Sequence, residues 1–189
     1  EAESFLNWRN SSQEKISSAI QGKTRPRVYF EGDNKGGLGE LSSYGSGSGI
    51  NGLIEISGGT NIAGELKMYP KFPWEWIIDE NPDIILRRQT SNNLGFDTES
   101  EEIMKAIKEV RNEILARPGA ANITAIKDEK VYVVFWSMLM GMDSVVGQAY
   151  LANIFYPEID LHPEELYREY LDFLAMKLPE NRDYIYPMT

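Results

Sequence analysis

The sequence contains no cysteine and a single histidine, His162, among its 189 residues. Without cysteine, the chain can form no disulfide, no thiolate metal site and no cysteine nucleophile. His162 stands at a predicted helix start, where capping or solvation explains it better than metal ligation does. We therefore expect neither a resident metal nor a cofactor. No run of eighteen apolar residues occurs, so the sequence predicts no membrane-spanning helix.

Positive charge is also scarce. The 19 Lys and Arg residues are outnumbered by 29 Asp and Glu residues, which gives a formal net charge of −10. This balance argues against a nucleic-acid partner and favours a solvated acidic surface. An apolar content of 42% and a charged content of 25% are typical of a globular domain. A chain of this length can bury one core of ordinary size.

Catalytic signatures of hydrolases are missing as well. No serine combines a nucleophile-elbow context with a histidine base. The carboxylates fall mainly on predicted helix surfaces, where solvation accounts for them. These observations predict that the protein is not an enzyme, unless its glycine-rich segment binds a nucleotide.

Residues 44–65 form that glycine-rich segment, YGSGSGINGLIEISGGTNIAGE. Gly47, Gly49 and Gly52 have the G-x-G-x-x-G spacing of dinucleotide-binding loops, which require a strand directly before the first glycine. The preceding residues, GGLGELSSY, do not have a strand pattern. The segment therefore predicts a turn that opens a helix and presents free backbone N–H groups. A nucleotide- or cofactor-dependent α/β enzyme that uses the 47–52 turn remains the alternative.

Helical and strand patterns alternate along the chain. Apolar periodicity predicts helices over residues 3–21, 48–57, 73–81 and 143–155. Two further helices are predicted from their start signals: one begins at a Thr98–Glu101 capping box and the other at His162-Pro163. Apolar runs predict strands over residues 27–30, 83–86 and 130–136, the last of them buried on both faces. The alternation predicts a three-layer α/β fold, in which helices flank a mostly parallel central sheet.

Ligands of open parallel sheets bind beyond the carboxyl ends of the strands. The predicted strand ends, with the turn that follows the first strand, bring together guanidinium groups, aromatic rings and hydroxyls. Arginine binds carboxylates in a bidentate manner and aromatic rings stack on planar groups, so the set suits a bulky ligand with apolar faces and anionic groups. The predicted ligand-binding residues are Glu31, Tyr44, Ser46, Ser48, Arg87, Arg88, Trp136 and Met138. We expect Arg87 or Arg88 to face the ligand.

Four segments occur in an order that resembles a known family. They are RVYFEG, a Gly/Ser turn leading into LIEISGGTNIA, WEWIIDENPDIILRR and RPGAANITAIKDEKVYVV. The order resembles the C-terminal lobe of ABC-importer solute-binding proteins, in the class III periplasmic binding group that takes up ferric siderophores, haem and cobalamin. The resemblance spans residues 27–174, and SGGTNIA and W-I-I-x-x-N-P-D-I-I are its most specific elements.

The resemblance implies a two-lobed receptor that captures an iron chelate, haem or a corrinoid between its lobes and delivers it to ABC permease subunits. It assigns residues 1–22 to the end of the long helix that connects the lobes, 23–178 to the C-terminal ligand-binding lobe and 179–189 to an irregular tail, with the N-terminal lobe absent from this chain. It also implies an extracytoplasmic location, peripheral to the membrane. Direct metal binders of the related cluster use histidines, so an intact chelate is favoured over a bare cation.

The resemblance further implies a surface carboxylate that docks onto arginines of the permease. In some relatives this acid lies within the GG-x-N-I-A element, where the present chain has Thr60. Glu55 and Glu65 are nearby carboxylates and are therefore the predicted docking residues.

Overall fold

A computed structural model describes residues 2–32, 37–89 and 95–187 of the chain. Its helices are α1 (Ala2–Ile20), α2 (Gly49–Ile56), α3 (Trp74–Glu80), α4 (Glu101–Leu115), α5 (Thr124–Lys127), α6 (Ser144–Phe155) and α7 (Pro163–Phe173). Its strands are β1 (Arg27–Glu31), β2 (Leu41–Ser42), β3 (Thr60–Asn61), β4 (Lys71–Phe72), β5 (Ile84–Gln89), β6 (Phe96–Asp97), β7 (Val131–Phe135), β8 (Arg182–Asp183) and β9 (Ile185–Tyr186). Within this described part, no helix has both the length and the apolar character needed to cross a bilayer.

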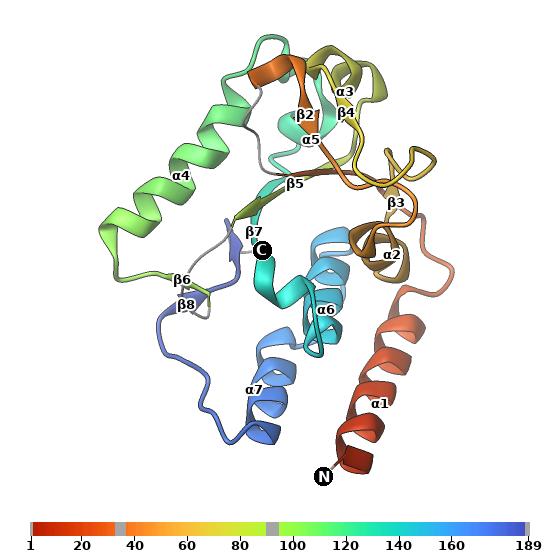
Figure 1. Cartoon of the computed structure of the whole chain (residues 1–189), viewed down its shortest axis with the longest axis vertical. Helices are drawn as coiled ribbons and strands as arrows, with labels where there is room; N and C mark the ends of the chain where they lie inside the picture. Colours follow the sequence, from red (N-terminus) through yellow and green to blue (C-terminus); the bar gives the residue numbers. More distant parts are fainter. Residues whose placement is uncertain (1, 33–36, 90–94, 188–189) are drawn as a thin grey trace.

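The central sheet separates two layers of helices (Figure 1). Helices α3, α4 and α5 lie on one face, and helices α1, α2, α6 and α7 lie on the other. Five strands form the sheet in the order β3-β1-β5-β7-β9. β1 pairs in parallel with both β3 and β5, and β5 pairs in parallel with β7. The predicted three-layer α/β fold with a mostly parallel sheet is therefore confirmed.

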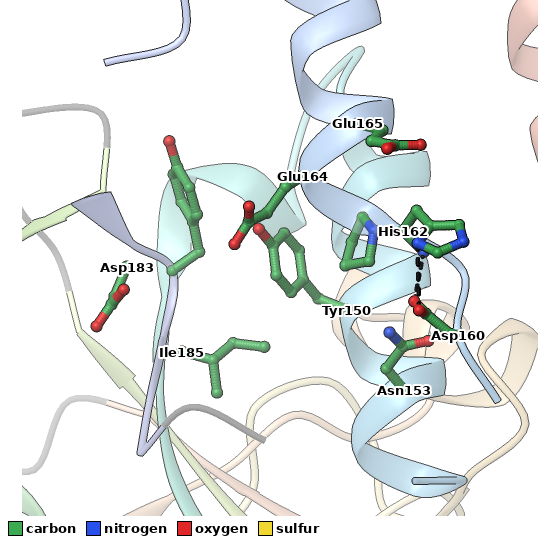
Figure 2. Close-up of a pocket in the computed structure, with 10 residues that line it drawn as sticks. Tyr150, Asn153, Asp160, His162, Glu164, Glu165, Asp183 and Ile185 are labelled. Atoms are coloured by element: carbon green, nitrogen blue, oxygen red, sulfur yellow. Dashed lines mark hydrogen bonds and ion pairs between the residues drawn. The ribbon is translucent and has the colours of Figure 1, made fainter. Parts of the chain in front are cut away.

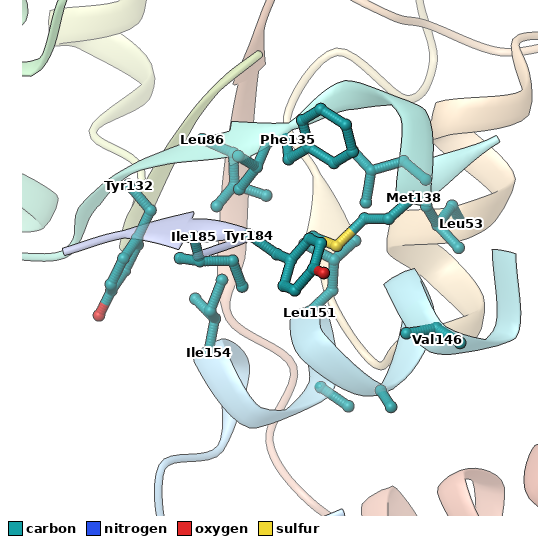
Figure 3. Close-up of a cluster of buried hydrophobic side chains, with 14 of the residues drawn as sticks. Leu53, Leu86, Tyr132, Phe135, Met138, Val146, Leu151, Ile154, Tyr184 and Ile185 are labelled. Atoms are coloured by element: carbon teal, nitrogen blue, oxygen red, sulfur yellow. The ribbon is translucent and has the colours of Figure 1, made fainter. Parts of the chain in front are cut away.

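Two apolar clusters hold the sheet between its helices. The larger cluster includes residues of α1, α2, α6 and α7 together with Ile107 of α4, and Figure 3 shows Leu86, Tyr132 and Ile154 within it. The smaller cluster lies on the other face and contains Tyr29 and Ile85. Neighbouring residues of one strand thus belong to different clusters, because successive side chains of a strand point to opposite faces. β7 is buried along its whole length, which explains its continuously apolar sequence.

The C-terminal segment is not the irregular tail that the sequence predicted. β8 pairs with β6, and β9 extends the main sheet antiparallel to β7. Tyr184 and Ile185 are buried there, in the same cluster as Phe135 (Figure 3). Strands of two residues are too short to show a period in the sequence, and pairing with the open edge of β7 creates β9.

Two further boundaries differ from the sequence prediction. Helix α4 begins after Ser100, whose hydroxyl accepts a hydrogen bond from the Ile103 N–H at 3.3 Å. Ser100 is therefore the N-cap in place of Thr98, since a capping oxygen bonds the N–H of the second or third helical residue. Strand β5 continues beyond its predicted end, which places Arg87 and Arg88 on the strand itself.

Candidate ligand-binding site

A pocket of about 380 Å³ opens where β5 and β7 end, at the carboxyl edge of the parallel strands. Its walls come from the segment after β2, the start of α2, the end of β5 and a 3-10 turn, η3 (Trp136–Leu139). The lining residues are Ser42, Ser43, Tyr44, Ser48, Gly49, Ile50, Tyr69, Arg88, Trp136 and Met140. Both the volume and the place are those expected of a ligand site in an open α/β sheet.

Arg88 and two aromatic rings form one wall of this ligand pocket. The Arg88 Nη1 donates a hydrogen bond to the Tyr44 hydroxyl at 2.9 Å, and the guanidinium carbon lies 4.4 Å from the centroid of the Trp136 ring. The Tyr44 and Trp136 rings stack at 5.6 Å, with 26° between their planes. A guanidinium held over aromatic faces attracts an anionic group, and the rings offer surface to a planar one.

The glycine-rich turn brings the N-terminus of α2 to the same pocket. Ser48 is the N-cap: its hydroxyl accepts a hydrogen bond from the Asn51 N–H at 3.2 Å and donates one to the Gly45 carbonyl at 2.8 Å. Gly47 has a φ of 83°, a left-handed conformation that glycine adopts without steric cost. The positive end of the helix dipole therefore lies at Gly49, in the pocket wall, where it favours negative charge.

The strand before this turn is not placed as dinucleotide binding requires. β2 ends at Ser42, but it pairs antiparallel with β4 in a ribbon separate from the main sheet. A dinucleotide-binding unit needs a parallel strand of the main sheet that runs directly into the glycine loop. The segment therefore serves as a turn and a helix start. The two-residue strand that precedes it was not predicted from the sequence.

Glu31 and Arg87 lie on the opposite face of the sheet from Arg88. The Glu31 side chain is fully buried, and its carboxylate accepts hydrogen bonds from the two Nη atoms of Arg117 at 2.7 and 2.8 Å. The Arg87 Nε lies 3.5 Å from Glu31 Oε1, and Arg87 also donates to the Gly32 carbonyl. The predicted ligand contacts of Glu31 and Arg87 are corrected accordingly. Successive strand residues alternate between faces, so Arg88 lines the pocket and its neighbour does not.

Arg117 anchors this buried ion-pair cluster. It also bonds the Glu113 carboxylate at 2.7 Å, and its guanidinium carbon lies 4.8 Å from the centroid of the Trp74 ring. Burial by itself would lower the pKa of Arg117, but hydrogen bonds to Glu31 and Glu113 raise it above the ordinary value. Burial, and then the charge of Glu31, raise the pKa of Tyr29 next to the cluster. These groups hold the end of β1 in place.

Two other predicted contacts are also corrected. Met138 is fully buried in the larger apolar cluster (Figure 3), because η3 turns it away from the surface. The Ser46 hydroxyl donates to the Leu66 carbonyl at 3.1 Å and does not line the pocket. Of the predicted ligand-binding residues, the structure brings four together in the pocket wall: Tyr44, Ser48, Arg88 and Trp136.

Tyr69 and Met140 line the pocket although the sequence did not indicate them. Their exposed fractions are 63% and 41%, and the Tyr69 ring meets the Tyr44 ring edge-on at 6.1 Å. The segment that carries Tyr69 is held against the glycine-rich turn, where the Gly45 N–H donates to the Met68 carbonyl at 2.7 Å. Exposed apolar side chains of this kind indicate a binding surface only once the fold is known.

The two predicted docking carboxylates have different surroundings. Glu55 forms an ion pair with Arg25 at 2.8 Å and accepts a hydrogen bond from the Asn61 N–H at 3.4 Å. Both partners of that ion pair are more than two-fifths exposed, so it contributes little stability. Glu65 is exposed in the loop after β3.

A family model described as periplasmic binding protein matches residues 1–134 of the chain. The molybdate-binding protein MolA of Haemophilus influenzae is 27% identical over 125 residues, which cover 63% of this chain and 31% of MolA. The TroA-like periplasmic binding protein FepB from Veillonella parvula has a similar structure, with a TM-score of 0.75 and 22% identity over all of this chain and 56% of FepB.

S. aureus IsdE complexed with haem is a further structural match. Its TM-score is 0.60 at 22% identity, over 82% of this chain and 57% of IsdE. The chain thus spans about half the length of these solved structures and about a third of MolA. At such identities the structural matches establish the fold, and the family model, which covers more than half of the chain, establishes the family. The chain belongs to the periplasmic binding protein family.

Proposed function

We propose that this chain is the ligand-binding lobe of an extracytoplasmic solute-binding protein of an ABC importer, and that it captures an intact metal chelate: a ferric siderophore, haem or a corrinoid. The observation that carries the proposal is the wall of Arg88, Tyr44 and Trp136 at the carboxyl edge of the sheet. Anionic oxygens of the ligand would accept hydrogen bonds from Arg88, while its planar or apolar parts would stack on the rings.

The remaining pocket residues suit the same ligand. The start of α2 adds positive potential at Gly49, and the exposed Tyr69 and Met140 would contact apolar parts of the chelate. The pocket surrounds a ligand from one side, whereas tight sites bury most of the ligand surface. A second lobe would supply the other side, and the lobes would close around the ligand. We therefore expect this chain alone to bind weakly.

The ligands of two similar proteins support an anionic ligand. IsdE was solved with haem, which carries carboxylates, and MolA is named for molybdate, an oxoanion. Both ligands present oxygens of the kind that Arg88 and the start of α2 would bind. A directly held cation has less support, because no group of three His, Cys, Asp or Glu side chains suited to a metal occurs in the part of the chain that the structure describes.

Delivery to the permease would use an acid on the surface of this lobe. Glu65 is the stronger candidate, since it is exposed, whereas Glu55 would first have to leave Arg25. Charge reversal at Glu65 would then reduce uptake without changing ligand affinity.

A thermal-shift panel on the full-length protein tests the proposed ligand class. The panel contains ferric siderophores, haem, cobalamin and molybdate. A ligand present at 100 times its Kd stabilises the folded state by about 2.7 kcal/mol. Arg88→Met should weaken binding of the active chelate by about tenfold or more. Arg9→Met, which changes an exposed arginine of α1, is the matched control and should bind like the wild type.

Three outcomes separate the possibilities. No stabilisation by any member of the panel would contradict the solute-binding assignment for these ligands. Equal affinity of wild type and the Arg88→Met variant would contradict the role of the aromatic wall. Stabilisation by molybdate alone would show that the ligand is an oxoanion and not a chelate, and it would still support a solute-binding role.

A further inference from the structure

A second pocket, the acidic pocket, has a volume of about 300 Å³ and lies between α6, α7 and the β8–β9 segment (Figure 2). Its lining residues are Tyr150, Asn153, Asp160, His162, Pro163, Glu164, Glu165, Asp183, Tyr184 and Ile185. It shares no lining residue with the ligand pocket at the carboxyl edge. Ligand binding in the acidic pocket is therefore independent of the proposed function.

Four of the ten described lining residues are Asp or Glu, and none of the ten is Lys or Arg. For three of these acids, the local structure explains the negative charge at that position. Glu164 and Glu165 lie in the first turn of α7, where the helix dipole favours negative charge. Asp160 accepts a hydrogen bond from the His162 N–H at 3.0 Å, and its other oxygen lies 3.2 Å from the His162 Nδ1.

Asp183 has no comparable local partner among the described residues. The guanidinium of its neighbour Arg182 is directed at Asp97, at 2.6 Å. Burial, and then the nearby charge of Glu164, raise the pKa of Asp183 above its ordinary value. Asp183 therefore adds to the pocket lining an acid that no described cation compensates.

Two tyrosine hydroxyls of the pocket are buried with no hydrogen-bond partner in the described part of the chain. The Tyr184 side chain is 3% exposed, and burial together with Glu164 raises its pKa to about 12. Tyr150 lies next to it, with 5.8 Å between ring centroids, and Figure 2 shows the Tyr150 ring directed toward Glu164. An unpaired buried hydroxyl destabilises a fold, so its presence in a cavity wall points to a missing partner.

We propose that the acidic pocket binds a small organic cation with a primary ammonium or guanidinium group. Its N–H donors would bond the Glu164 carboxylate and the hydroxyls of Tyr150 and Tyr184, its charge would lie beside the aromatic rings, and Asp183 would add negative potential at the edge of the pocket. A directly coordinated metal fits the pocket less well, because the described residues contain no group of three side chains arranged to hold one. The volume admits a diamine or a single basic side chain.

Isothermal titration calorimetry of the complete chain tests this proposal with 1,4-diaminobutane and guanidinium as free cations, and with N-acetyl-lysine amide for a lysine side chain of another polypeptide. We expect saturable binding of at least one probe. Tetramethylammonium has no N–H donor and should bind at least tenfold more weakly, by about 1.4 kcal/mol. Preference for the lysine amide over the diamine would support the site and assign its cation to a polypeptide.

Substitutions of lining residues test whether the probes bind in the acidic pocket. Glu164→Gln should weaken binding by about tenfold, and Asp183→Asn should weaken it less, because Asp183 acts only through its charge. Glu102→Gln, which changes an exposed acid of α4, is the control and should leave the affinity unchanged. Tyr184→Phe separates a ligand-binding hydroxyl from a structural one: it should raise the Tm of the ligand-free protein and yet weaken binding. No saturable binding, equal affinity in all variants, or equally tight binding of tetramethylammonium would each overturn the proposal.

Discussion

At the end of β5, two adjacent arginines point to opposite faces of the sheet and meet different surroundings. Arg87 joins Glu31 and Arg117 in a buried ion-pair cluster, whereas Arg88 lies over Trp136 and bonds Tyr44 in the wall of an open pocket. The same residue type therefore belongs to a buried ion-pair cluster on one face and to a pocket wall on the other. The pleat of the strand separates the two side chains, and the packing on each face decides what they do.

Disrupting the buried ion-pair cluster should lower the free energy of unfolding most. Glu31→Gln removes the charge that compensates the buried Arg117 guanidinium, so we expect the free energy of unfolding to fall by about 3–5 kcal/mol in urea titrations. Glu113→Gln removes an acid that is 54% exposed and pairs with the same arginine, and it should cost less than about 1 kcal/mol. Equal losses in the two variants would contradict the distinction.

Substitutions in the pocket wall should lower the free energy of unfolding by less. Tyr44→Phe keeps the stack on Trp136 and removes the hydroxyl that accepts from Arg88, so a loss of about 1 kcal/mol is expected in the same titrations. Tyr69→Phe, at a side chain that is 63% exposed, is the control and should change stability by less than about 0.5 kcal/mol. A loss from Tyr44→Phe as large as that from Glu31→Gln would show that the pocket wall is as rigidly built as the buried cluster.

A partly buried ion pair between two short strands should have the smallest effect at neutral pH. Asp97 and Arg182 lie 2.6 Å apart with both side chains less than a third exposed, and the hydrogen bond from Arg182 lowers the pKa of Asp97. The folded state therefore binds this proton less tightly than the unfolded chain does. The resulting stabilisation is present at neutral pH and is lost as the pH falls through the lowered pKa. Asp97→Asn should flatten the acidic part of a plot of Tm against pH, and an unchanged plot would show that the pair contributes nothing.

Much of the fold could be predicted from local patterns. The helical period of Ile103, Ile107 and Ile114 predicted α4, and the continuous apolar run of β7 predicted a strand buried on both faces. The rule that ligands bind at the carboxyl edge predicted that Arg88 and Trp136 would lie in one pocket, which the structure places there. Each of these inferences depends on residues close together in the chain or on a general property of parallel sheets.

Other features could not be read from such patterns. Strand β9 exists because β7 has an open edge, and its two residues carry no period of their own. Tyr69 enters the pocket because a backbone hydrogen bond joins Gly45 to Met68. Neither segment has a sequence pattern that predicts this contact. The acidic pocket likewise combines α6, α7 and the C-terminal segment, and its unpaired hydroxyls are visible only after packing.

The sequence by itself determined the class of fold, the order of most helices and strands, and the family to which the chain belongs, because periodicity, turn residues and short motifs are local properties. Tertiary structure alone decided which arginine lines the pocket at the carboxyl edge. Glu31 and Arg117 are 86 positions apart, and their pairing withdraws Glu31 from the pocket. The physical reason is burial: a carboxylate removed from water must be paired, and only the folded chain shows which cation pairs with it.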